Sequence, residues 1–346
     1  EALSASFSFD VSDDTLSISV RFLTENRAEA LALLKTALMQ PRFDPDAIER
    51  VRQQVLSILA SNAQDPPNTA QRVWAEQAFG DHAYGTSYQG TERSVAALTR
   101  SDLLAAHQNL LVRDTLSISA AGDITAEDLG PILDNLLGDL PAESALETAL
   151  LELDIPAGLT VVDMPTPQSV AIFGHEGIDR DHPDFFAAFI LNTILGGQGI
   201  ESRLTAEVRE KRGLTYGIST VLISKDQANV MLGQVASAND RINAAIEVIR
   251  DEWRKLARDG VTAEELQAAQ TYLTGAYPLR FDGNSQISRI LVGMQRIGLG
   301  LDYINNRNAK INAVTLSEIN RVAVQLLKPE ALNFVVAGQP TGLKEE

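Results

Sequence analysis

The stretch that decides the fold occurs twice, as TRSDLLAAHQNLLVRDTLSISAAG at residues 99–122 and as TLSEINRVAVQLLKPEALNFVVAG at residues 315–338. Each copy opens with a threonine three residues before an acidic residue, which is the pattern of a helix-capping box. Each then runs through an apolar helix pattern and a short turn into an apolar strand pattern that ends in glycine. The offset, 315 − 99 = 216, holds without a gap, so we interpret the two stretches as an internal repeat.

The repeat extends upstream of both stretches. Residues 4–10 and 15–22 alternate between apolar and polar side chains around a polar turn, and residues 216–223 and 229–235 do the same. Two helices are predicted after each strand pair: residues 27–39 and a helix opening at Asp44-Pro45 in the first copy, residues 241–258 and a helix opening at Thr262 in the second.

The second copy has a front section that the first copy lacks. It comprises predicted strands at 159–163 and 169–174, a helix over 183–195 that ends at Gly196-Gly197, and a short helix over 201–212. Because residue 1 aligns near residue 214, the first copy lacks the counterpart of roughly residues 158–213. We therefore expect an α+β fold of two tandem homologous units, each a mixed or antiparallel sheet packed with helices. The units are residues 1–142, incomplete at the N-terminal end, and residues 157–346, complete.

Composition narrows the class of protein. The 346 residues include 46 acidic and 29 basic ones, a formal charge of −17, which disfavours nucleic acid as a partner. No apolar run approaches the roughly 20 residues of a membrane-spanning helix. The absence of cysteine excludes disulfides and cysteine-ligated metals. Since the first residue is Glu1, we expect the natural N-terminus, and any signal peptide on it, to lie upstream.

No familiar catalytic motif is present. The four histidines form neither H-x-x-E-H nor H-E-x-x-H, and no nucleophile elbow or phosphate loop occurs. The notable pair is Arg209, near the predicted end of a helix, and Tyr216, at the predicted start of the next strand. Arginine offers up to five donors and tyrosine one hydroxyl, a combination suited to a peptide carbonyl or an oxyanion. The spacing alone is weak, because arginine suits a last helical turn and tyrosine suits a strand.

The wider context of the pair is more specific. Gly196-Gly197, Ser202-Arg203-Leu204, Arg209 and Gly213-Leu-Thr-Tyr216 together resemble the second half of the pitrilysin/insulinase-type metallopeptidases, the inverzincins. The resemblance covers nearly the whole chain. It implies tandem α+β units around a peptide, with zinc bound by H-x-x-E-H and a downstream glutamate in the first unit. It also implies an Arg/Tyr pair in the second unit that reaches the substrate, and Arg209 and Tyr216 occupy those positions.

The chain departs from the family at the third zinc ligand. The resemblance places the ligating glutamate at Ile58, on the helix that opens at Asp44. Ile58 also falls with Ile48, Val51 and Val55 at helical spacing, which predicts a core face. We therefore expect no metal in this chain and no catalytic residue of its own. Zinc is expected in a partner subunit instead.

In the bacterial branch of this family that uses two separate chains, one subunit carries zinc and the other the Arg/Tyr pair, and this chain resembles the second kind. The resemblance therefore implies a non-catalytic subunit of a heteromeric zinc peptidase, inactive by itself, in which Arg209 and Tyr216 support binding of the peptide and its transition state. The expected partner is a homologous zinc-bearing subunit. The resemblance to the family also implies that the two subunits lie in the bacterial periplasm. Two alternatives stay open. In the first, the chain forms a self-dimer and is a homodimeric zinc endopeptidase, with H-x-x-E-H in the missing segment. In the second, it is a purely structural family member.

Overall fold

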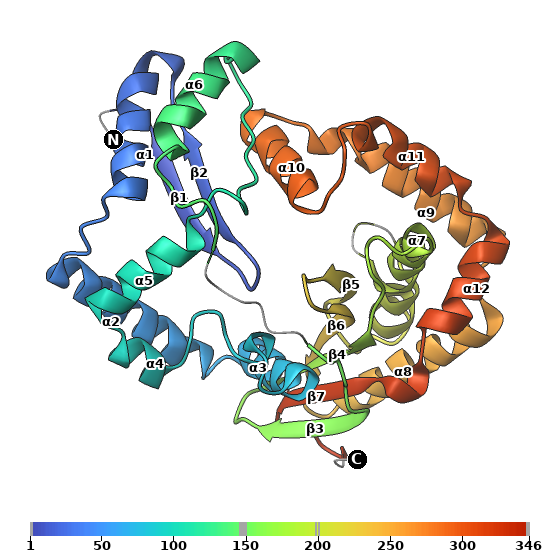
Figure 1. The fold of residues 1–346 in the computed structure, drawn as a ribbon. Coiled ribbons are helices and arrows are strands. Elements are labelled where there is room, and N and C mark those ends of the chain that lie inside the picture. Colours follow the sequence, from blue (N-terminus) through green and yellow to red (C-terminus); the bar gives the residue numbers. More distant parts are fainter. Residues whose placement is uncertain (1–2, 145–150, 198, 200, 344–346) are drawn as a thin grey trace. The chain divides into compact units, whose positions relative to one another are not determined.

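The computed structural model describes residues 3–144, 151–197, 199 and 201–343, and it divides into two compact units (Figure 1). Unit 1 comprises Glu1–Ile58, Gln89–Thr148 and Pro278–Asn305; unit 2 comprises Leu59–Tyr88, Ala149–Tyr277 and Asn306–Glu346. Neither unit is one continuous stretch of sequence. The boundaries of the compact units therefore differ from those of the predicted repeat segments, 1–142 and 157–346. Part of the expected linker between the repeats, residues 145–150, lies outside the described residues.

Unit 2 is built on a five-stranded mixed sheet of order β3-β7-β4-β6-β5. The strands are β3 (Gly158–Asp163), β4 (Gln168–Glu176), β5 (Ile218–Ser224), β6 (Asn229–Ala238) and β7 (Asn333–Gly338). β3 runs parallel to β7, and every other neighbouring pair is antiparallel. β4 is the central strand, since Phe173 pairs with Gly233 of β6 on one side and with Phe334 of β7 on the other. The sheet confirms the expected α+β class.

Helices cover both faces of this sheet. One face packs on the main core with α7 (Phe185–Gly196), α8 (Ile242–Asp259), α9 (Ala263–Ala276) and α12 (Leu316–Leu326), and α11 (Tyr303–Ala313) adds Ile311. The other face packs on α3 (Pro66–Phe79) through Ala70, Trp74 and Phe79. Alternation along β4 explains the two cores, because Ala171 and Phe173 face the first while Ile172 faces the second.

Unit 1 has a smaller frame. Its antiparallel pair is β1 (Ser6–Val11) and β2 (Leu16–Arg21), and its helices are α1 (Arg27–Met39), most of α2 (Pro45–Asn62), α4 (Glu92–Ala97), α5 (Arg100–Leu110), α6 (Ala126–Leu137) and α10 (Asn284–Arg296). Among the described residues, the buried members of its apolar cluster are Leu34 and Leu38 of α1 and Leu136 of α6. Within the described residues of both units, no helix is long and apolar enough to cross a membrane.

One helix of each predicted repeat copy packs in the unit that holds most of the other predicted copy. α3 belongs to the first copy by sequence, yet it packs in unit 2, where Gln77 hydrogen-bonds Thr160 of β3 and Asn333 of β7. Its counterpart at the offset of 216, α10, belongs to the second copy and lies in unit 1, where Gln295 accepts the amide of Ile118. This packing explains why the compact units are discontinuous in sequence.

Local signals in the repeat are confirmed where they concern helices. Thr99 with Asp102, and Thr315 with Glu318, form complete capping boxes at α5 and α12. Thr262 does the same at α9 with Glu265. Each box satisfies backbone N–H groups that the first helical turn leaves without partners.

Two expectations for the first copy are wrong. Residues 117–122 form no strand, whereas their counterpart β7 does. The predicted core face of α2 is also open, with Val51 51 % and Ile58 37 % exposed. Both differences have one physical reason. β7 pairs with β3 and β4, and α9 packs on α7. β3, β4 and α7 all belong to the front section, which has no counterpart within residues 1–346.

Candidate functional site

Arg209 and Tyr216 lie in unit 2, on the segment that joins α7 to β5. Arg209 belongs to a π-helical segment, Thr205–Glu210, instead of the ordinary helix predicted over 201–212. The amide of Lys211 reaches the carbonyl of Ala206 at 2.9 Å, the i to i−5 bond of that geometry. Such wide turns are frequent at functional sites. Tyr216 precedes β5, which begins at Ile218, so Tyr216 is a loop residue and does not open the strand as predicted.

Buried neighbours anchor the segment on both sides of the pair. Leu204 and Val208 are fully buried in the main core. Thr215 is 7 % exposed, and its hydroxyl donates to the carbonyl of Ala236 on β6 at 2.6 Å. That hydroxyl also accepts the amide of Gly217 at 3.0 Å. The backbone on each side of Tyr216 is therefore tied to the sheet.

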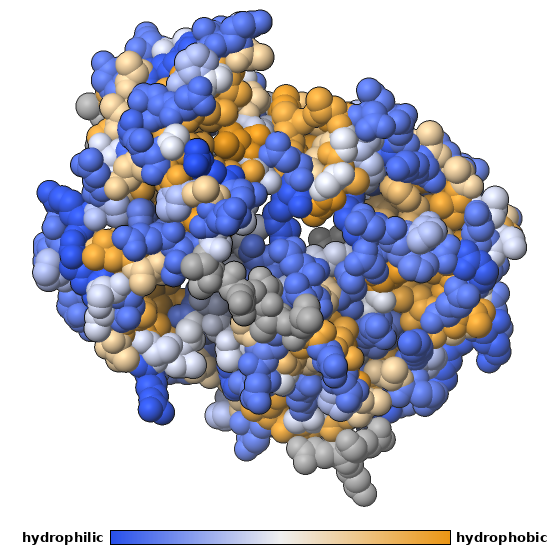
Figure 2. Space-filling model, viewed as in Figure 1, coloured by the Kyte–Doolittle hydropathy of each residue, from blue (hydrophilic) through white to orange (hydrophobic). Residues whose placement is uncertain are grey.

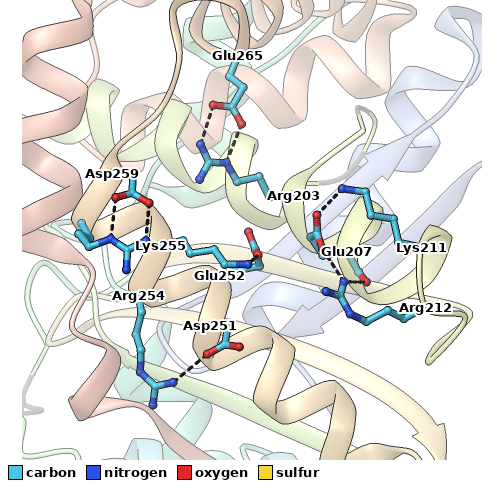
Figure 3. A network of polar contacts seen from close by, with 11 residues as sticks. Arg203, Glu207, Lys211, Arg212, Asp251, Glu252, Arg254, Lys255, Asp259 and Glu265 are labelled. Carbon is cyan, nitrogen blue, oxygen red and sulfur yellow. Dashed lines mark hydrogen bonds and ion pairs between the residues drawn. The ribbon is translucent and has the colours of Figure 1, made fainter.

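A further anchor was not foreseen from the sequence. Arg203 makes a two-pronged ion pair with Glu265 of α9, with Nε to Oε1 at 2.6 Å and Nη2 to Oε2 at 2.7 Å (Figure 3). Nη2 also donates to the carbonyl of Gly260 at 2.9 Å. Burial opposes ionisation of Glu265, but hydrogen bonds from Arg203 and Thr262 outweigh it and hold the pKa of Glu265 below its ordinary value. The sequence showed only the capping role of Glu265.

Glu207 fixes the end of the π-helical segment. Its carboxylate contacts Arg212 and Lys211, each at 2.5 Å (Figure 3). These hydrogen bonds, from Arg212 first and Lys211 second, lower the pKa of Glu207 to about 2. Arg212 also donates to the backbone carbonyl of Glu207 at 2.7 Å, five residues before it in the chain. This contact matches the i to i−5 spacing of the π-helix and gives a local reason for the wide turn.

Between these anchors, the two candidate side chains are free. Tyr216 is 90 % exposed, and Arg209 is exposed as well. Neither side chain has a hydrogen bond or an ion pair to the residues that the structure describes. Nearby Arg203 and Arg212 are each held by an ion pair, to Glu265 and Glu207 respectively, whereas Arg209 is an unpaired guanidinium on an anchored segment. Such a segment can present donors to a bound carbonyl or carboxylate with little loss of conformational entropy.

The residues that the structure describes do not form a site that fits zinc. No group of three or more histidine, cysteine or acidic side chains in metal-binding geometry occurs among the described residues. Ile58 offers no donor atom; it is assigned to unit 1, whereas Arg209 and Tyr216 are assigned to unit 2. Each histidine already uses a ring nitrogen within the chain: His82 with the Tyr84 amide, His107 with the Leu38 carbonyl, His175 with the Glu176 carbonyl and His182 with the Asp184 amide.

His175 is the most buried of the four, at 1 % exposure. Its Nε2 accepts the indole N–H of Trp253 at 3.1 Å, while Nδ1 lies 2.6 Å from the carbonyl of Glu176. Both nitrogens are therefore occupied in the neutral ring. Burial holds the pKa of His175 below its ordinary value, although the hydrogen bond to Glu176 opposes that shift. These contacts make His175 a structural residue.

Comparison with known proteins finds similar chains over most of the sequence. The family described as peptidase M16 inactive domain matches residues 97–273. A Helicobacter pylori protein named a non-peptidase homolog is 25 % identical over 321 residues, covering 92 % of this chain and 74 % of that protein. A Mycobacterium tuberculosis protein named an uncharacterized zinc protease is 28 % identical over 304 residues, covering 86 % of this chain and 69 % of that protein.

Solved structures show the same fold. A peptidase M16 inactive domain from Pseudomonas fluorescens has a TM-score of 0.89 and 25 % identity, covering 99 % of this chain and 82 % of that one. A chain of complex III from Candida albicans has a TM-score of 0.77 at 14 % identity, covering 97 % of this chain and 82 % of that one, and shares the fold alone. The family match spans half of the chain and confirms the resemblance to the pitrilysin/insulinase-type enzymes. The chain therefore belongs to the peptidase M16 family and contains its inactive domain.

Proposed function

We propose that this chain is the non-catalytic subunit of a two-chain zinc peptidase, in which Arg209 and Tyr216 complete the active site of a homologous, zinc-bearing subunit. The observation that carries the proposal is the state of these two side chains. Both are exposed and unpaired within the described residues, on a segment whose neighbours are anchored by burial and by ion pairs. The inactive-domain family match and the absence of a donor at Ile58 support the same assignment.

The chemistry assigned to the pair is transition-state support. Attack of water on a peptide carbonyl places negative charge on its oxygen, and that oxyanion is stabilised by donors already in place. The guanidinium of Arg209 and the hydroxyl of Tyr216 supply such donors, and both also bind the neutral carbonyl of the substrate. The partner supplies the metal and the attacking water. No proton transfer is assigned to this chain.

The test is peptide cleavage by the reconstituted pair of subunits. Losing one oxyanion donor lowers turnover by roughly 10²–10³, so Arg209→Ala and Tyr216→Phe should each reduce kcat in that range. Arg258→Ala and Tyr88→Phe serve as matched controls, because Arg258 and Tyr88 are exposed side chains outside the segment. The controls should leave kcat unchanged. Wild-type kcat in both Arg209→Ala and Tyr216→Phe would refute the proposed role.

The same experiment separates the alternatives. A homodimeric zinc enzyme would cleave peptides without a second subunit, and the natural protein would contain stoichiometric zinc. A purely structural subunit would show no cleavage with any zinc-bearing homologue, and its peptide affinity would be unaffected by Arg209→Ala.

A further inference from the structure

The segment that carries Arg209 contains one wide turn. It begins in α-helical geometry, since the amide of Ala206 donates to the carbonyl of Ser202, four residues earlier, at 2.9 Å. The amide of Lys211 then reaches back five residues, to the carbonyl of Ala206. A wide turn of this kind is equivalent to one inserted residue, and an inserted residue turns the following side chains by about 100°. The direction of Arg209 therefore depends on whether the wide turn is kept.

The end of the segment keeps the extra residue. Gly213, in the left-handed region at φ 60°, ends the helix. Its amide donates to the carbonyl of Arg209, and the amide of Leu214 donates to the carbonyl of Val208, each at 2.9 Å. In the usual glycine-terminated helix the two corresponding bonds span one residue less. The widening thus extends from Ala206 to Leu214, and Arg209 lies inside it.

The apolar spacing of the segment favours a different geometry. Leu204 and Val208 are both buried in the main core, four residues apart. A continued α-helix would place Lys211, seven residues after Leu204, on the same face. In the structure the side chain of Lys211 is 64 % exposed instead. The wide turn avoids the cost of burying an ammonium group, but π-helical geometry is rare, so we looked for what supports it.

Glu207 supplies that support. Its carboxylate bridges Lys211 and Arg212, four and five residues later, each at 2.5 Å (Figure 3). Arg212 also donates through Nη1 to the carbonyl of Glu207, the group that an i to i−5 bond from the Arg212 backbone would use. The Glu207 side chain is only 19 % exposed, and its pKa of about 2 keeps it ionised at neutral pH. Both ion pairs therefore hold the two cations away from the core.

Exposure alone does not distinguish Arg209, because much of the surface seen in Figure 2 is hydrophilic, in blue. Arg209 differs from Lys211 and Arg212 in having no ion pair among the described residues, and Glu207 does not pair with it. Glu207 can act on Arg209 only through the backbone, by fixing the residues that follow it. Without the bridge, return to α-helical bonds is opposed only by the cost of moving Lys211 toward the core.

We infer that Glu207 is a positioning residue for Arg209, because its bridge to Lys211 and Arg212 keeps the wide turn that sets the direction of the guanidinium. The catalytic consequence rests on the proposed function, whereas the structural content does not. Loss of the bridge turns Arg209 away from the position in which it meets the substrate. A misplaced group of this kind lowers turnover by up to about 100-fold.

Peptide cleavage by the reconstituted pair of subunits tests the catalytic consequence. Glu207→Gln removes the charge of the bridge at almost constant size and should lower kcat by about 10- to 100-fold. Glu210→Gln is the matched control and should leave kcat unchanged. Glu210 has the same charge in the same segment, but it is exposed and has no ion pair among the described residues.

A double-mutant cycle separates positioning from a general structural effect. In the Arg209→Ala background, Glu207→Gln should cause no further loss of kcat, because it acts through Arg209. An equal loss of kcat in both backgrounds would overturn the inference. So would a kcat for Glu207→Gln as high as that of Glu210→Gln while Arg209→Ala is impaired.

A distance measurement tests the positioning itself, whatever the activity. The chain contains no cysteine, so Arg209→Cys and Ser224→Cys together create one pair of spin-labelling sites, on the segment and at the exposed end of β5. Adding Glu207→Gln should shift the distance between the labels, and adding Glu210→Gln should not. An unchanged distance would overturn the inference and leave the proposed function standing. A shifted distance together with wild-type kcat in Arg209→Ala would refute the proposed function and support the positioning by Glu207.

Discussion

Breaking the ion pair between Arg203 and Glu265 should destabilise unit 2 by about 2–3 kcal/mol. Removing one partner of a fully buried pair costs about 3–5 kcal/mol, because the remaining charge stays buried without compensation. An exposed pair contributes about 0–1 kcal/mol. The side chains of Arg203 and Glu265 are 19 % and 30 % exposed, and two short hydrogen bonds join them, so the expected cost lies between these limits.

The measurement is urea unfolding followed by tryptophan fluorescence. The chain has two tryptophans, Trp74 and Trp253, and both are buried in unit 2, so the signal reports the unit that contains the pair. Arg203→Met and Glu265→Gln should each lower the free energy of unfolding by about 2–3 kcal/mol. The double variant should cost less than the sum of the two, because the interaction can be lost only once.

The control is the exposed pair of Arg258 and Asp259, whose side chains are 71 % and 57 % exposed. Arg258→Met should change the free energy of unfolding by less than about 0.5 kcal/mol. If Arg203→Met and Glu265→Gln each cost no more than this control, then the pair does not anchor the segment that carries Arg209. Additive effects in the double variant would also refute the coupling.

Two further predictions concern unit 2. The free energy of unfolding should fall as the pH drops below about 6.5, by up to about 1.4 kcal/mol per pH unit, because His175 protonates in the unfolded chain while burial keeps it neutral in the folded one. The nearby charges are Glu176 and Lys328, whose side chains pair at 3.8 Å. His175→Gln should flatten the dependence of the unfolding free energy on pH in this range. An unchanged slope would contradict the assignment of this pH dependence to His175. Gly196→Ala should lower the free energy of unfolding in urea by about 1–3 kcal/mol, because the added Cβ would lie 2.5 Å from Oγ1 of Thr220. An unchanged free energy of unfolding would contradict this prediction and show that β5 can shift at little cost.

Local sequence signals predicted the helical frame well. α1 runs over Arg27–Met39, as expected, and the three capping boxes at Thr99, Thr262 and Thr315 formed. These features depend on residues within one or two turns of each other, which a single sequence displays directly.

Features that depend on distant partners were not predictable from the local pattern. Residues 117–122 have the composition of a strand, but a strand forms only where a neighbour pairs with it. Ile58 has the spacing of a core residue, yet burial needs an element opposite the helix face. The sequence also did not predict that α3 packs in unit 2 and α10 in unit 1. Both helices have ordinary apolar faces, which do not specify the unit in which they pack.

The candidate site divides in the same way. Arg209 and Tyr216 were identified from the family resemblance, and the structure shows them exposed on an anchored segment. The π-helical turn was not predicted. The ion pair of Arg203 and Glu265 was not predicted either, because these two residues are 62 positions apart in sequence. Charged residues so far apart give no pairing signal in a single sequence.

The central claim, that this chain completes a partner's active site without metal of its own, is tested most directly by titration. A fixed amount of the zinc-bearing homologue is mixed with increasing amounts of the natural form of this chain, and the rate of peptide cleavage is measured together with the zinc content of each subunit. The account predicts no cleavage by either subunit alone, a rate that saturates at one chain per partner, and zinc only in the partner. Cleavage by this chain alone, with stoichiometric zinc bound to it, would contradict the account.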